Sequence, residues 1–151
     1  MINIALYQPD IPQNTAAIIR LGACLGLKIH IIEPCGFNIR DKRFQRVAMD
    51  YIKLTKIIRY DDYIAFTKKN FKSRIILVTT KSENKYHNFN FKKNDILLFG
   101  KESAGVPKNI HQEIKDKITV PMKKKVRSLN VAMTVAVVSS EAIRQIGFKN
   151  D

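Results

Sequence analysis

The sequence predicts an α/β fold in which a mainly parallel sheet is flanked by helices. Six short runs rich in Ile, Leu and Val alternate with segments of helical periodicity. Several of these runs contain continuous stretches of Ile, Leu and Val, which are typical of strands that are covered on both faces. A chain of 151 residues can bury a sizeable core, so we expect a single domain over residues 1–151.

The apolar runs are the predicted strands, and the segments between them are the predicted helices. The strands are expected at 2–7, 28–33, 56–60, 74–80, 95–100 and 117–122. The helices are expected at 14–25, 41–51, 61–70, 107–115 and 129–146. The segment 82–95 is polar and irregular, and it is predicted to be a surface loop.

Capping residues set the expected helix ends. Asn14 is the expected N-cap of the first helix, which should end at Gly26, and Pro107 opens the fourth helix. Ser128 or Asn130 caps the last helix, and Gly147 closes it. The side chains of this helix are apolar or small on nearly all sides. We therefore expect the helix to be buried on most sides, in the core and at a dimer interface.

The composition favours a nucleic-acid partner. Lys and Arg total 27 against 13 Asp and Glu, which gives a net charge of +14. Domains this basic usually bind a polyanion, most often nucleic acid. A general enrichment of the surface in lysine is the alternative explanation.

Several other classes of protein are disfavoured. Cys24 and Cys35 form no CxxC pair and the three histidines are scattered, so we expect free thiols, a cytoplasmic protein and no metal site. The N-terminus does not resemble a signal peptide, and the apolar stretch 131–138 is too short to span a bilayer, so no membrane partner is expected. GxGxxG and GxxxxGK[ST] motifs are absent, which removes the main support for NAD or ATP binding.

Two stretches in the C-terminal half have the features of ligand loops. In "FGKESAGVP" (99–107), Gly100 and Gly105 flank Glu102, which disfavours a phosphate ligand and suits a positively charged ligand or one with donor groups. A plain strand–turn–helix connection explains this stretch equally well. In "PMKKKVRSLN" (121–130), cations precede a helix N-terminus, whose free N–H groups suit polar ligand atoms.

Two stretches in the N-terminal half carry candidate charged residues. Arg20 lies on the helix that follows Asn14, and the two residues either belong to a site or only cap and salt-bridge that helix. The stretch "RDKRFQR" (40–46) places four cations at a predicted helix start, where they oppose the helix dipole unless phosphates neutralise them. A solvated helix face is the alternative interpretation.

As a set, four colinear blocks resemble the TrmL family of the SPOUT superfamily of knotted methyltransferases. They are "NIALYQPDIPQNT" with "IIRL", "HIIEPCGF" with "DKR", "LLFGKESAGVP", and "VPM" with "RSLNV", in the family's order over nearly the full chain. Members of this family 2'-O-methylate the wobble nucleotide, position 34, of certain leucine tRNAs. The resemblance therefore implies an S-adenosylmethionine (SAM)-dependent tRNA 2'-O-methyltransferase, with S-adenosylhomocysteine as product.

The resemblance also implies a C-terminal trefoil knot, a homodimer and a set of site residues. The target nucleotide is expected near the partner's N-terminal helix, and segments near 78–80, 100–105 and 120–130 are expected to form the SAM pocket. The expected cofactor-binding residues are Val78, Thr79, Gly100, Glu102, Gly105, Val120, Met122, Ser128 and Leu129. The expected catalytic residues are Arg20, Arg127 and Asn130, and the expected RNA-binding residues are Arg40, Lys42, Arg43, Arg46, Lys123, Lys124 and Lys125.

The chain departs from the family pattern at three places. Ala16-Ala17 replaces the usual Gly-Asn, Ala132-Met133 replaces a Ser-Asn pair, and Ser140 stands where a tyrosine is usual. Two further functions therefore stay open: a 2'-O-methyltransferase of ribosomal RNA, and an RNA-binding protein of the same fold without catalysis.

Overall fold

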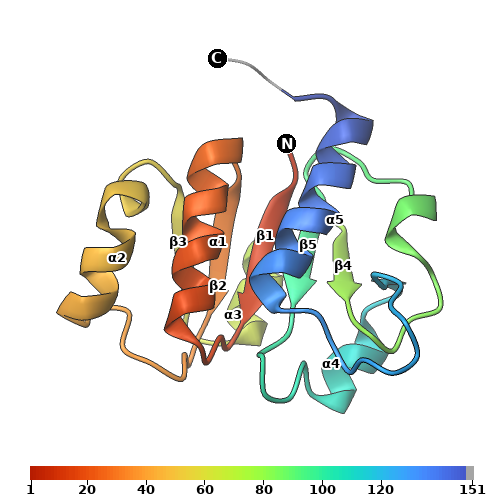
Figure 1. Ribbon diagram of the computed structural model, residues 1–151, viewed down its shortest axis with the longest axis horizontal. Helices are drawn as coiled ribbons and strands as arrows, with labels where there is room; N and C mark the ends of the chain where they lie inside the picture. Colours follow the sequence, from red (N-terminus) through yellow and green to blue (C-terminus); the bar gives the residue numbers. More distant parts are fainter. Residues whose placement is uncertain (149–151) are drawn as a thin grey trace.

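The sheet contains six strands, all parallel. The computed structural model describes residues 1–148, the side chain of Met49 excepted (Figure 1). The strand order is β3-β2-β1-β5-β4-β6, and every pair of neighbours is parallel, which confirms the predicted fold class. The strands are β1 (Asn3–Tyr7), β2 (Lys28–Ile32), β3 (Ile57–Tyr60), β4 (Ile75–Val78), β5 (Ile96–Phe99) and β6 (Asp116–Ile118), close to the predicted ranges.

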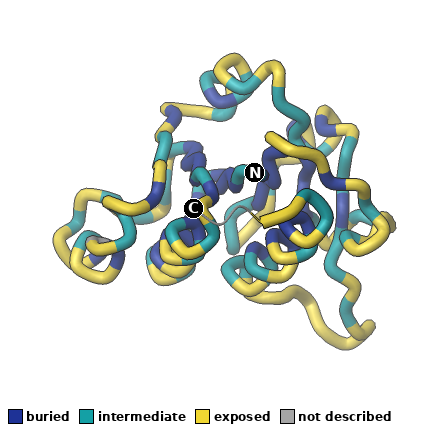
Figure 2. Tube along the Cα trace, turned by 90° about the horizontal axis from the view of Figure 1, so that it is seen from above, coloured by how far each residue is buried: buried dark blue, intermediate teal, exposed yellow. Residues whose placement is uncertain are grey.

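Helices cover both faces of this sheet, and Figure 2 shows the buried strands between two outer layers. One layer holds α1 (Pro12–Leu25), α2 (Lys42–Ile52) and α5 (Val131–Ile146), and the other holds α3 (Tyr63–Lys69) and α4 (Lys108–Glu113). In β1, Ile4 and Leu6 pack in the core beneath α1 and α5, whereas Ala5 and Tyr7 pack with residues of α3 and α4. Burial on both sides explains why β4 and β5 are apolar at every position. No helix within residues 1–148 combines the length and apolarity needed to cross a membrane.

The chain changes face between the neighbouring strands β1 and β5. After β1 it turns to α1 on one face, and after β5 it turns to α4 on the opposite face. The two connections therefore diverge at the carboxyl ends of adjacent strands. Such a switch point opens a crevice in parallel sheets, and ligands commonly bind there.

The start of α1 corrects the sequence prediction. The helix begins at Pro12, with Ile11 at the N-cap position and no capping side chain, so Asn14 is not the N-cap. Proline suits the first helical position because its φ is already helical and it has no N–H to leave unpaired. Asn14 thus lies inside the first turn, and its side chain is free to contact other segments. The end at Gly26 is confirmed, with φ at 64°.

The segment 82–95 is more ordered than the predicted surface loop. It contains a 3-10 turn, η1 (Tyr86–Asn88), and Phe91 is only 6% exposed in the core. The side chain of Gln145 on α5 fixes it by accepting from the Phe91 N–H at 3.0 Å and donating to the Phe89 carbonyl at 2.9 Å. Because the segment is mostly polar, the sequence did not indicate that Phe89 and Phe91 hold it in place.

The helix α5 is buried on one face only, which contradicts the expectation of burial on most sides. Val135, Val138 and Ala142 are fully buried, but Met133 is 61% exposed and Val137 lies on the open side. Within residues 1–148 of a single chain, nothing packs on this apolar outer face. Of the two predicted caps, Asn130 is the one used: its Oδ1 accepts from the N–H groups of Ala132 and Met133 at 2.9 and 3.3 Å.

His30 is a buried histidine of β2 with one of its nitrogens unpaired. The side chain is 2% exposed, and Nδ1 lies 2.8 Å from the hydroxyl of Tyr60. Nε2 has no hydrogen-bond partner among the described residues. Burial, with a smaller contribution from the charge of Lys28, lowers the pKa of His30 to about 4. The native state therefore holds this imidazole neutral.

We expect His30 to make the protein less stable as the pH falls. The unfolded chain takes up a proton near pH 6.5, whereas the native state resists it down to about pH 4. Stability should thus be lost across this window, by ~1.4 kcal/mol per pH unit and about 3 kcal/mol in total. Urea unfolding of His30→Phe should lack this slope, while the exposed-site control His87→Gln should keep it. Equal slopes in wild type and His30→Phe would contradict the assignment.

Candidate active site

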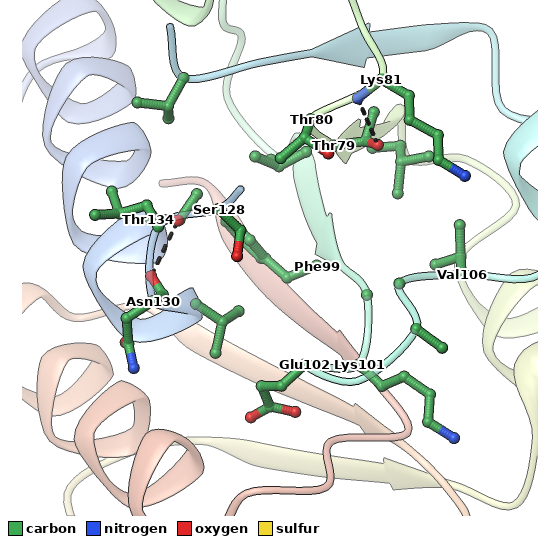
Figure 3. A pocket seen from close by; sticks show the side chains of 18 of the residues that line it. Thr79, Thr80, Lys81, Phe99, Lys101, Glu102, Val106, Ser128, Asn130 and Thr134 are labelled. Carbon is green, nitrogen blue, oxygen red and sulfur yellow. Dashed lines mark hydrogen bonds between the residues drawn. The ribbon is translucent and has the colours of Figure 1, made fainter. Parts of the chain in front are cut away.

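A pocket of about 520 Å³ lies at the carboxyl ends of β4 and β5 (Figure 3). Three loops form most of its wall: 79–81 after β4, 100–106 after β5, and 119–130 before α5. The beginning of α1 adds Ile11 and Asn14, and α4 adds His111. The pocket therefore reaches the switch point between β1 and β5, and its volume is in the range of small-molecule sites.

The structure brings the nine expected cofactor-binding residues together. They come from the end of β4 and from the three loops, they span 51 positions of sequence, and all of them line this pocket. They are Val78, Thr79, Gly100, Glu102, Gly105, Val120, Met122, Ser128 and Leu129. Asn130, one of the three expected catalytic residues, lines the pocket as well.

The two glycines of the 100–106 loop are required by the turn itself. Lys101 and Gly105 exchange two backbone hydrogen bonds, with N–O distances of 3.2 and 2.8 Å. A Cβ on Gly100 would lie 2.5 Å from the carbonyl carbon of Gly105, and Gly105 has a φ of 68°. Side chains larger than hydrogen would force this tight loop open.

Glu102 connects this loop to the segment after β1. Its carboxylate accepts from the Asp10 backbone N–H at 3.0 Å and from Asn14 Nδ2 at 3.2 Å. In return, Asp10 Oδ1 accepts from the Glu102 backbone N–H at 3.1 Å, and Asp10 Oδ2 accepts from the Ser103 hydroxyl. Both loops at the switch point are thus held by reciprocal hydrogen bonds.

Asn14 extends this network to the start of α5. Its Oδ1 accepts from Asn130 Nδ2 at 2.9 Å, while Asn130 Oδ1 caps α5. We call the side chains of Asp10, Asn14, Glu102 and Asn130 the polar junction. It ties three pocket segments to one another across 92 and 116 positions of sequence.

The carboxyl group of Asp10 has a lowered pKa in this junction. The hydrogen bonds that it receives from Glu102 and Ser103 lower the pKa of its carboxyl group to about 2. The carboxylate therefore stays charged down to about pH 2, and its oxygens accept hydrogen bonds from the Glu102 N–H and the Ser103 hydroxyl.

The two expected catalytic arginines lie outside this pocket. Arg20 is on the exposed side of α1, where its guanidinium carbon lies 5.0 Å from the ring centroid of Tyr51 on α2. Arg127 is exposed in the loop before α5. Neither arginine is among the described residues that line the pocket, so one chain alone does not bring the three expected catalytic residues together.

The expected RNA-binding cations form two exposed groups. Lys123, Lys124 and Lys125 lie in the turn that precedes Ser128 at the pocket's rim. Arg40, Lys42, Arg43 and Arg46 lie at the beginning of α2, where Asp41 is the N-cap. Asp41 accepts from Arg43 through Nε and Nη2 at 3.3 and 3.2 Å, so one of the four cations is paired locally.

Sequence reasoning missed Asp10 and His111 and left the role of Asn14 open, whereas the structure places all three at the site. Asp10 was given no role, Asn14 was expected to cap α1 with a place in a site left open, and His111 was expected to be a surface or strand residue rather than a ligand. The position of Asp10 just after β1 was an available signal, because the carboxyl end of a strand at a switch point commonly faces a ligand. No metal-binding group of three or more His, Cys, Asp or Glu occurs within the described residues.

Comparison with known proteins assigns the chain to a family. The model of the SpoU rRNA methylase family matches residues 1–140. The chain belongs to this family. The resemblance found in the sequence is thereby confirmed at the level of the family.

Relatives and solved structures that are similar to this chain align with nearly all of its residues. A tRNA (cytidine(34)-2'-O)-methyltransferase of Beijerinckia indica is 44% identical over 146 residues, 95% of this chain and 91% of the relative. The protein of the same name from Escherichia coli K12 is 41% identical over 150 residues, 98% of this chain and 96% of the relative. A solved structure of a putative RNA methyltransferase from Bacillus anthracis superposes with a TM-score of 0.92 at 34% identity, covering 99% of this chain and 97% of the other.

We expect Asp10→Ala to loosen the pocket loop without unfolding the protein. The substitution removes the acceptor of the Glu102 N–H and the Ser103 hydroxyl, which should cost about 1–3 kcal/mol at neutral pH. Because the pKa of Asp10 is lowered, this difference from wild type should shrink as the pH falls from about 4 towards 2. Amide hydrogen exchange should accelerate in residues 100–106. Equal exchange in Asp10→Ala and the exposed-site control Asp50→Ala would contradict the role of the junction.

Proposed function

We propose that this chain is a SAM-dependent tRNA ribose 2'-O-methyltransferase that modifies the wobble nucleotide, position 34, of leucine tRNAs. The observation that carries the proposal is 41–44% identity, over at least 95% of the chain, to relatives named tRNA (cytidine(34)-2'-O)-methyltransferase. The net charge of +14 suits a polyanionic substrate such as tRNA.

The pocket residues fit SAM. A volume of about 520 Å³ is sufficient for a nucleoside with an amino-acid side arm. Val78, Val120 and Leu129 offer apolar surface to an adenine ring, and the Glu102 carboxylate adds negative charge beside a cationic ligand. When bound, SAM supplies a methyl group that is already activated by its sulfonium, so the reaction requires no metal.

The protein's contribution is then alignment and stabilisation of charge. A ribose 2'-OH must lie in line with the methyl group, and holding it there can lower the barrier substantially. Arginine stays protonated in proteins, so Arg20 is a poor base. We assign Arg20 to orient the 2'-OH or the adjacent phosphate and to stabilise the developing alkoxide, while water or a phosphate oxygen accepts the proton. Arg127 and Asn130 complete the proposed catalytic set.

A homodimer brings these residues together in the proposal. Arg20 lies outside the pocket of its own chain, so we place it at the pocket of a second copy. The exposed apolar side of α5, with Met133 and Val137, offers an interface, and α5 packs beside α1, which carries Arg20. Three departures from the family pattern, Ala17, Met133 and Ser140, are exposed on these two helices, where contacts with a partner would differ from those of relatives.

The remaining parts of the proposal concern chain path and location. We propose that residues 1–151 form one domain and that the segment 119–130 threads a C-terminal trefoil knot before α5. The pocket's three loops, which follow β4, β5 and β6, support this path. Free Cys24 and Cys35 suit a cytoplasmic protein that encounters tRNA there.

One experiment tests the function directly. The purified protein is incubated with bulk tRNA and SAM labelled in its methyl group, and ribose methylation is mapped in cells with and without the protein. We expect transfer to tRNA and loss of one 2'-O-methyl mark at position 34 in the deletion. A lost mark on ribosomal RNA would instead identify an rRNA enzyme, and tRNA binding without transfer would identify a non-catalytic RNA-binding protein.

We expect Arg20→Ala to abolish methyl transfer while leaving SAM affinity nearly unchanged, because Arg20 lies outside the pocket of its own chain. Calorimetric titration with SAM and a transfer assay measure the two effects, with the exposed Arg59→Ala as the matched control. Mixing Arg20→Ala with Asn130→Ala chains should restore transfer, since one site per mixed dimer would be intact. A large loss of SAM affinity in Arg20→Ala would place this arginine in the cofactor site instead.

We expect Lys123→Glu combined with Lys125→Glu to weaken tRNA binding and to flatten its dependence on salt. For each RNA phosphate that the protein no longer neutralises, the slope of log K against log salt should fall by about 0.7–0.9. Filter binding between low and moderate salt measures this slope, and Lys68→Glu combined with Lys69→Glu at the end of α3 is the control. A slope equal to that of wild type would show that residues 123–125 are only a solvated surface.

A further inference from the structure

A second pocket, of about 400 Å³, lies between the beginnings of α1 and α2. We call it the α1–α2 pocket. Its apolar lining includes Ala16, Phe37, Phe44 and Val47, and Gln13 and Asn38 add polar side chains. Phe44 and Ala16 are buried, whereas Val47 is 70% exposed. The mechanism proposed above uses none of these side chains.

Two aromatic rings give this pocket a specific shape. Phe37 and Phe44 lie with ring centroids 5.2 Å apart at an interplanar angle of 42°. The rings come from the segment before α2 and from α2 itself, and α1 supplies the opposite wall. A flat apolar ring could enter here against Phe37, with the amide groups of Gln13 and Asn38 available to its polar edge.

Positive charge surrounds the same pocket. Arg43 lines it and is paired with Asp41, so the one carboxylate in the lining is already neutralised. Arg40, Lys42 and Arg46 are exposed nearby on the same segment, and no carboxylate in the described part of the chain lies within salt-bridge distance of them. A planar apolar group attached to a phosphate chain matches both features.

The position of the pocket relates it to the active site. The first turn of α1 separates the two: Ile11 and Asn14 line the active-site pocket, whereas Pro12, Gln13 and Ala16 line the α1–α2 pocket. The distance across one helix with its side chains is about 10–12 Å. A nucleotide that follows or precedes another in a single-stranded loop can span such a distance when its base is turned out.

We propose that the α1–α2 pocket binds an unpaired nucleobase of the substrate RNA, from a nucleotide adjacent in the loop to the one that is methylated. The proposal rests on the function proposed above for its RNA substrate. Proteins that recognise single-stranded RNA commonly stack unstacked bases on aromatic side chains and hold the backbone with cations. The pocket thus acts in substrate recognition, and the methyl-transfer chemistry occurs elsewhere.

The test uses an anticodon stem-loop RNA that carries 2-aminopurine on either side of the target nucleotide. Stacking quenches the fluorescence of this base, so wild-type protein should quench one of the two probes. Phe37→Leu removes the ring but keeps an apolar side chain, and Val47→Asp places a carboxylate at the exposed mouth of the pocket. We expect both variants to lose the quenching and to bind the stem-loop roughly tenfold or more weakly, as expected when one base–aromatic stack is removed.

Controls separate the pocket from other effects. Ile64→Asp makes the same change of charge at another exposed aliphatic residue, on α3, and should bind as wild type does. Thermal melting of each variant checks folding, and Val47→Asp, on an exposed side chain, keeps the test valid if Phe37→Leu is unstable. Quenching and affinity equal to wild type in Val47→Asp would overturn the proposal. A change in the oligomeric state of Val47→Asp would also overturn it, since the surface would then bind a second copy.

The same samples distinguish this proposal from the proposed function. Methyl transfer from labelled SAM is measured beside fluorescence. Quenching that depends on Phe37 and Val47, in a protein that transfers no methyl group, supports the base pocket and removes the enzymatic function. Transfer by a wild-type protein that quenches neither probe supports the enzyme and overturns the base pocket.

Discussion

The polar junction is the constraint on which the active-site pocket depends. A parallel sheet by itself leaves its carboxyl-end loops independent, and at the switch point they diverge to opposite faces. Here Glu102 and Asp10 join the loops after β5 and β1 by reciprocal hydrogen bonds, and Asn14 joins both to the cap of α5. A pocket wall made of separate loops is thereby held in one arrangement before any ligand binds, which lowers the cost of ordering on binding.

Most of the fold could be predicted from the sequence because it depends on local patterns. Continuous apolar runs mark strands covered on both faces, and Gly26 and Gly147 mark helix ends. The predictions were wrong where contacts between residues far apart in the sequence determine the local structure. Asn14 does not cap α1 because Pro12 starts the helix earlier and Glu102, 88 positions away, binds the amide. Phe91 is buried because α5 reaches back to the 82–95 segment through Gln145.

The site was predictable only in part, and for a different reason. Nine of the residues that line the pocket were suggested by a resemblance to a family, and no periodicity would have grouped positions 78, 100 and 128. Asp10 was missed because its role depends on two hydrogen bonds with Glu102, which is 92 positions away in the sequence. The positions of Arg20 and Arg127 outside the pocket could not be inferred from sequence, since a residue can serve the site of a partner chain.

The capping of α5 gives the junction a fixed direction. Asn130 Oδ1 is committed to the helix N–H groups, so its Nδ2 must donate to Asn14 Oδ1. Asn14 is then left with only its amide hydrogens, which it offers to Glu102. Neither amide can flip without breaking at least two of these hydrogen bonds. The atom of residue 102 that faces Asn14 and receives its amide hydrogens must therefore be an acceptor. Because the Asp10 N–H donates to the other side-chain oxygen, position 102 must supply two acceptors, which a carboxylate has and an amide does not.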